Sequence, residues 1–65
     1  MTLLQLAAAL KDDTLIKVTQ GTSELIAFYS KGSASIDATL GATTVSEIAI
    51  VKTNNGIRLD VVVAE

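Results

Sequence analysis

The chain has 65 residues, a formal net charge of −2, no cysteine and no histidine. This length fits one small domain, residues 1–65, and the missing residue types exclude disulfides, histidine-based catalysis and a Cys/His zinc site. The charges are scattered, so we expect neither nucleic-acid binding nor an acidic tail. Only 3% of the residues are aromatic, which leaves few large side chains to bury and favours oligomerisation.

A helix is predicted from about Leu3 to Lys11. Thr2 and Gln5 have the spacing of a capping box at its start. One face is apolar and is expected to point to the core; it carries Leu3, Leu6, Ala7 and Leu10. The alternative is a helix that binds a partner, but its back face is hardly polar, with Leu4, Ala8 and Ala9.

The apolar run before Lys11 is too short to cross a bilayer and lacks the basic start of a signal peptide. We therefore expect a cytoplasmic protein without a membrane partner. Asp12-Asp13 follows, and two adjacent acids without further oxygen ligands indicate a solvated turn rather than a metal site.

Residues 14–20 and 24–30 are predicted to form a first β-hairpin around Gly21-Thr22-Ser23, because both segments are rich in β-branched or aromatic residues. An even loop would align Ile16 and Val18 with Leu25, Ala27 and Tyr29. An odd loop would align them with Ile26 and Phe28, which buries more hydrocarbon and is preferred.

Residues 34–40 fit two interpretations. They alternate as a fifth strand would, and they also fit a short helix capped by Ser33 or Ser35 and ending at Gly41. A helical or irregular crossover between two hairpins is favoured slightly.

The strongest local signal is Asn55-Gly56, which predicts a tight turn joining strands 45–53 and 57–63. With these two residues in the turn, Ile50 faces Val61 and Ile48 faces Val63. The inner face then carries Ile48, Ile50, Ile57, Leu59, Val61 and Val63, of which all except Ile57 are expected to hold the domain together.

The predicted fold class is therefore α+β. An N-terminal helix packs on a mostly antiparallel four-stranded sheet made of two hairpins, with a short helix or an extra strand at about 34–40.

The predicted function is contact rather than catalysis, without a cofactor or metal. Glu47 and Asp60 are the carboxylates nearest to a pair, and they are expected to solvate the sheet rather than act as an acid and base. The outer face of the last hairpin is the candidate interface of a homodimer or of an unknown protein partner. It comprises Ala49, Val51 and Val62, flanked by Glu47, Arg58 and Asp60. Alternatively, the crossover covers this patch.

Two resemblances concern origin and function. The order of a Leu-rich helix, an acidic turn, a strand pair, a crossover and a final hairpin resembles small, uncharacterised phage and prophage proteins. The segments that carry this likeness are Leu3–Leu6, Asp12–Val18, Val45–Ile48 and Asn55–Val61. This resemblance implies a fold and a phage accessory role, with no activity attached.

The second resemblance is to phage inhibitors of uracil-DNA glycosylase, and it implies an inhibitor of a host enzyme as the alternative function. It rests on Tyr29-Ser30-Lys31-Gly32, Ser35-Ile36-Asp37, Leu40-Gly41 and Ser46-Glu47-Ile48. The chain departs from that family at Ile36 and Leu40, where aromatic residues stand in the family, and at Phe28, which replaces an acid. A net charge of −2 is also low for a mimic of DNA.

Overall fold

The computed structural model describes residues 1–64, apart from the side chain of Ala34. In chain order the elements are helix α1 (Leu3–Ala9), strands β1 (Leu15–Gln20) and β2 (Ser23–Tyr29), the 3₁₀ helix η1 (Ser30–Ser35), helix α2 (Ala38–Gly41), and strands β3 (Val45–Thr53) and β4 (Gly56–Val63).

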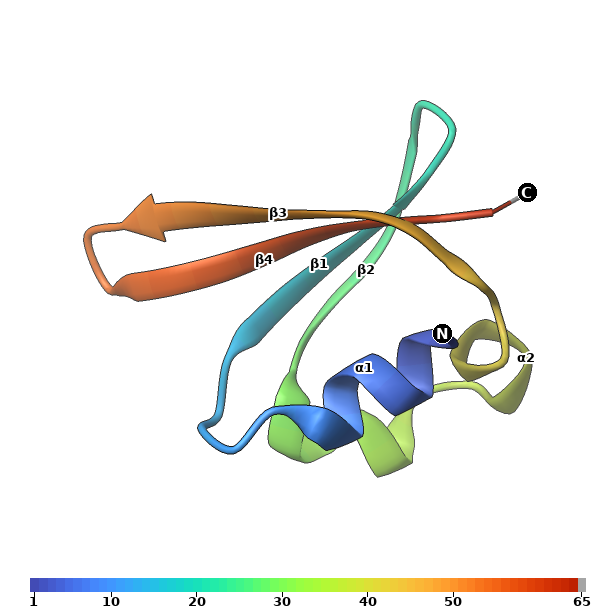
Figure 1. Ribbon diagram of the computed structural model, residues 1–65, viewed down its shortest axis with the longest axis horizontal. Helices are drawn as coiled ribbons and strands as arrows, with labels where there is room; N and C mark the ends of the chain where they lie inside the picture. Colours follow the sequence, from blue (N-terminus) through green and yellow to red (C-terminus); the bar gives the residue numbers. More distant parts are fainter. Residues whose placement is uncertain (65) are drawn as a thin grey trace.

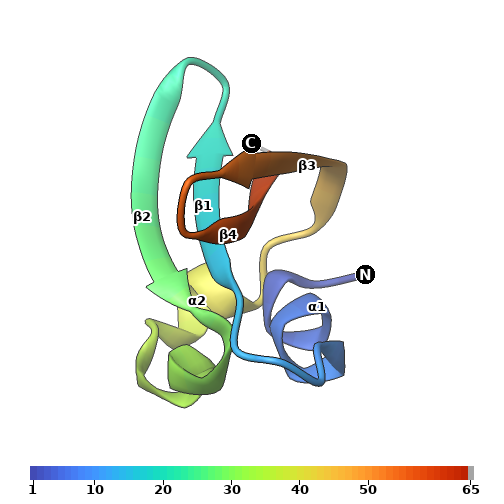
Figure 2. The same ribbon diagram turned by 90° about the vertical axis from the view of Figure 1, so that its left-hand side faces the viewer.

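Within residues 1–64, the strands form one sheet in the order β2-β1-β4-β3, and the helices gather on one side of it (Figures 1 and 2). β1 pairs with β2, and β3 with β4, in antiparallel hairpins. The two hairpins meet through a parallel contact between β1 and β4. The predicted α+β fold of two hairpins with a helix against the sheet is confirmed, and its one parallel junction places β1 and β4 at the centre.

Helix α1 begins with the predicted capping box. The Gln5 backbone N–H donates to Thr2 Oγ1 over 3.2 Å, and the Thr2 N–H donates to Gln5 Oε1 over 2.9 Å. The helix ends at Ala9, two residues earlier than predicted, because Leu10 already has an extended backbone. Its apolar face points to the sheet as expected: Leu3, Leu6 and Ala7 are buried, and Leu10 packs against them.

The core lies between α1 and the two central strands. β1 contributes Ile16 and Val18. The buried residues of β4 alternate along the strand and are Leu59, Val61 and Val63. Since successive side chains of a strand point to opposite faces, this alternation fixes which face of the sheet meets the helix.

The first hairpin has the preferred face alignment, but by an unexpected route. Its turn consists of two residues, Gly21 and Thr22, which alone would have aligned the wrong face. A β-bulge then inserts Leu25 into β2, so that Ile16 pairs with Phe28 and Val18 with Ile26. The extra residue thus shifts the alignment of the two strands by one residue, as a loop with an odd number of residues would have done.

The last hairpin keeps the predicted faces, but its predicted register was wrong by two residues. Ile50 pairs with Leu59 rather than Val61, and Ile48 pairs with Val61 rather than Val63. Asn54 and Asn55 form the turn, and both keep negative φ angles. Gly56, with φ of 128°, is therefore the residue of this hairpin that has a positive φ. It is the first residue of β4 and not, as predicted, the second residue of the turn.

The linker between the hairpins is helical, which settles the two interpretations of residues 34–40. The predicted serine caps of α2 were wrong, because Asp37 is the N-cap. Its Oδ1 accepts from the Thr39 N–H at 2.7 Å and from the Leu40 N–H at 3.3 Å. Because the Asp37 carboxylate is charged, these two hydrogen bonds stabilise the start of α2.

Candidate interaction surface

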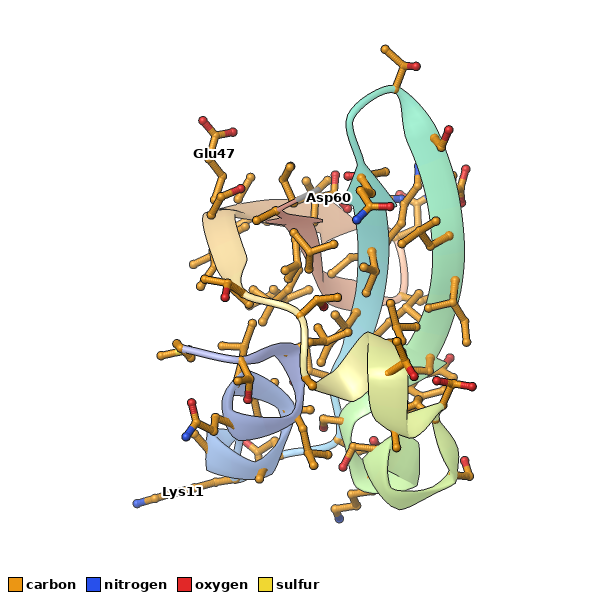
Figure 3. The ribbon with its side chains drawn as sticks, turned by 90° about the vertical axis from the view of Figure 1, so that its right-hand side faces the viewer. Lys11, Glu47 and Asp60 are labelled. Atoms are coloured by element: carbon orange, nitrogen blue, oxygen red, sulfur yellow. The ribbon has the colours of Figure 1, made fainter. Side chains whose placement is uncertain are left out.

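The six residues predicted as an interface lie on the outer face of the sheet, away from α1. Figure 3 shows Glu47 and Asp60 on the side of the sheet opposite the helices. Their neighbours differ from the predicted ones because of the altered register. Three cross-strand pairs bring the set together: Glu47 with Val62, Ala49 with Asp60, and Val51 with Arg58.

This outer face is more polar than its sequence suggests. Arg58 and Asp60 form a two-pronged ion pair, with Nε to Oδ1 at 2.8 Å and one terminal guanidinium nitrogen to Oδ2 at 3.2 Å. Val51 and Val62 are half-buried, and Ala49, although exposed, is small. The charges of Arg58 and Asp60 therefore neutralise each other. Because the three apolar residues are small or half-buried, this face exposes little apolar area to a partner.

A larger apolar surface lies on the opposite face of the same hairpin. Ile48, Ile50 and Ile57 are 47%, 71% and 56% exposed, respectively. The strand pairing sets Ile50 beside Ile48 along β3 and diagonal to Ile57 on β4. We call these three side chains the isoleucine surface.

The isoleucine surface is exposed because the helical layer does not reach it. The turn between β3 and β4 projects beyond α1 (Figure 1). The prediction that Ile48 and Ile50 help to hold the domain together was therefore wrong. They share the face of Leu59 and Val61, but only those two residues lie under the helix and are buried.

β3 is also an edge strand, and its first residues are already covered. The Val45 N–H donates to the Met1 carbonyl over 2.8 Å, and the Leu3 N–H donates to the Thr43 carbonyl over 3.0 Å. The N-terminal segment thus pairs with the start of β3, through an antiparallel bridge between Thr2 and Thr44.

Beyond this covered part, the direction of each backbone group of β3 follows from the ladder. Val45 points its N–H away from β4, and a bulge then places Ser46 as one extra residue before Glu47. Backbone direction alternates along an antiparallel strand, and both residues of a bulge face the neighbouring strand. The outward N–H and C=O groups are therefore those of Ile48, Ile50 and Lys52. Among the described residues, no strand pairs with them.

An open hollow of about 580 Å³ lies at one end of the sheet, where the α1–β1 loop meets the last hairpin. Its lining includes Asp13, Tyr29 and Arg58. Asp13 Oδ1 accepts from the Lys31 N–H at 3.0 Å and so ties this loop to the first turn of η1. Asp13 thus braces the fold beside this hollow, and the Arg58 guanidinium is held by Asp60.

Two further results concern metals and membranes. Within residues 1–64, no group of three acidic side chains is close enough to hold a metal ion. In the same part of the chain, no helix has both the length and the hydrophobicity needed to span a bilayer.

Comparison with known proteins gave no match to any protein-family model, curated protein sequence or solved structure.

The residues that carried the resemblance to glycosylase inhibitors are placed for packing. Ile36 and Leu40 are half-buried against the core, and Ile36 lies beside Gly41, where an added Cβ would be 3.6 Å from its Cδ1. Side chains held in this way are poorly available for insertion into the pocket of an enzyme.

Proposed function

We propose that the protein is a non-catalytic interaction module that associates with itself through the β3 side of its sheet. The observation that carries this proposal is the coincidence of the isoleucine surface with an unpaired stretch of edge strand. Exposed apolar side chains favour association, and the unpaired N–H and C=O groups of an edge strand determine how a second strand aligns with it.

The composition of β3 supports the same role. Ile48-Ala49-Ile50-Val51 contains no charge, and only Glu47 and Lys52 bracket it. Edge strands of monomers commonly carry a central lysine, a proline or a bulge that blocks further pairing. β3 has its bulge at Ser46, outside this central stretch.

The available area predicts a weak dimer. The exposed parts of the three isoleucines amount to roughly 300 Å² per copy, and a lasting interface buries about 1,200 Å² or more in total. Even two copies that covered all three side chains and a short length of backbone would stay below that size. We therefore expect a dissociation constant on the order of tens of micromolar.

Sedimentation equilibrium over about 1 to 500 µM, a range that brackets this dissociation constant, tests the proposal. The expected result is an average mass that rises from one chain, 6.8 kDa, towards two. A mass that stays at one chain up to the highest concentration would contradict self-association.

A further inference from the structure

We infer that the dimer forms one continuous sheet, in which β3 of one copy pairs antiparallel with β3 of a second copy and the twofold axis passes beside Ile50. This inference rests on the proposed self-association and specifies its geometry. A second copy of the chain would occupy the outward edge of β3.

The pairing of outward backbone N–H and C=O groups selects this register. Each copy offers the outward N–H and C=O groups of Ile48, Ile50 and Lys52. With the axis at Ile50, Ile50 faces Ile50 of the second copy, and Ile48 faces Lys52 of the second copy. Every outward residue then meets another outward residue, so all of these donors and acceptors can be paired.

Neighbouring registers satisfy fewer groups. An axis beside Ala49 would place Lys52 opposite Ser46 of the second copy, whose backbone is turned towards β4 by the bulge. It would also push Thr53 against Val45 of the second copy, where the Met1 carbonyl already accepts the N–H. The N-terminal segment that covers the start of β3 therefore limits how far the β3 strands of two copies can overlap.

Side chains agree with the same register. Residues directly opposite in a sheet share a face, so on the helix side Ile50 would meet Ile50 of the second copy, and Ile48 would pack against the aliphatic part of Lys52 of the second copy. On the outer face, Ala49 would lie opposite Val51 of the second copy. Ala49 and Val51, two of the residues predicted as an interface, would thus contact the second copy along the edge of the sheet and not across its outer face.

The other edge explains why assembly would stop at two copies. β2 is interrupted by the bulge at Leu25 and carries Glu24, whose carboxylate lies 3.7 Å from the Lys17 ammonium. A bulge and a charge both oppose further strand addition. A twofold contact uses the same surface on each copy and is therefore closed.

A cysteine scan measures the register, because the native chain contains no cysteine. Single substitutions to Cys at Ile48, Ala49, Ile50, Val51 and Lys52 are oxidised under identical conditions, and the disulfide-linked dimer is quantified. In the proposed register the two Cα atoms at position 50 lie about 5.5 Å apart, which a disulfide can span. Those at positions 49 and 51 lie about 8 Å apart, since they are offset by two residues along the strand.

We expect Ile50→Cys to cross-link several-fold more than any other variant. Strongest cross-linking at Ala49→Cys or Val51→Cys would overturn the register. Uniformly weak cross-linking of a chain that sediments as a dimer would overturn edge pairing but leave self-association standing. A native chain that stays monomeric would contradict the proposed self-association itself.

A second pair of variants tests the backbone hydrogen bonds directly. Proline has no N–H, and a sheet edge tolerates it where the N–H faces outward. Lys52→Pro should therefore weaken the dimer by roughly tenfold or more, because the bond is lost twice across the twofold axis. Lys52→Thr loses the same side chain but keeps the N–H, and it should dimerise as the native chain does. Equal dimerisation of the two variants, each shown to be folded by circular dichroism, would rule out edge pairing.

Discussion

Replacing Ile16 with Ala is expected to lower the free energy of unfolding by about 3 kcal/mol. Ile16 is fully buried in the central strand β1, beneath α1. A domain of this size has a total stability of only about 3–5 kcal/mol. The variant should therefore retain only about 0–2 kcal/mol at 25 °C, and a urea titration followed by far-ultraviolet circular dichroism should show its unfolding midpoint falling by more than half.

The matched control is Ile50→Ala, which removes the same atoms from a side chain that is 71% exposed. Measured at about 1 µM, where the dimer should dissociate, it is expected to change stability by less than about 0.5 kcal/mol. Equal losses for the two variants would mean that the helical layer covers Ile50 as well, contrary to the structure.

The elements could be predicted because their signals are local. The Thr2–Gln5 capping box fixes the start of α1 through contacts within one turn. The alternation of Leu59, Val61 and Val63 fixes which face of β4 is buried, whatever the register. The bounds of β3 coincide with the predicted residues 45–53 because β-branched residues fill that segment up to the asparagine turn.

The register of each hairpin could not be predicted, because it depends on residues that only the assembled sheet reveals. Leu25 and Ser46 become bulges through pairing with neighbouring strands, and nothing in their own sequence marks them. Asn55-Gly56 signals a turn correctly, but it does not say which residues occupy the turn. Here Gly56 provides the positive φ as the first residue of β4.

The exposure of the isoleucine surface was missed for a reason of scale. Helix α1 has seven residues and is about 10 Å long, at 1.5 Å per residue. β3 has nine residues and spans about 30 Å. A helix about 10 Å wide also covers only two strands spaced 4.8 Å apart. It therefore shields β1 and the part of β4 from Leu59 onward, and leaves Ile57 near the turn and Ile48 and Ile50 of β3 to solvent. Binary patterning reports which face is apolar, but not how much of it is covered.

Ile50→Lys is expected to abolish dimerisation while leaving the monomer folded. In the proposed register the two introduced lysines face each other across the twofold axis, with Cα atoms about 5.5 Å apart. Like charges directly opposite destabilise a sheet. Since Ile50 is exposed in the single chain, the substitution buries no charge in the monomer. Sedimentation velocity at about 200 µM, well above the expected dissociation constant, should show one monomeric species.

Two controls make this loss specific to the position. Ala8→Lys adds the same charge on the exposed side of α1 and should leave the dimer intact. Ile50→Glu should also be monomeric alone, yet an equimolar mixture with Ile50→Lys should restore a dimer, because opposite charges then face each other across the axis. This rescue requires residue 50 of one copy to meet residue 50 of the other. A mixture that stays monomeric would show that Ile50 does not lie at the axis.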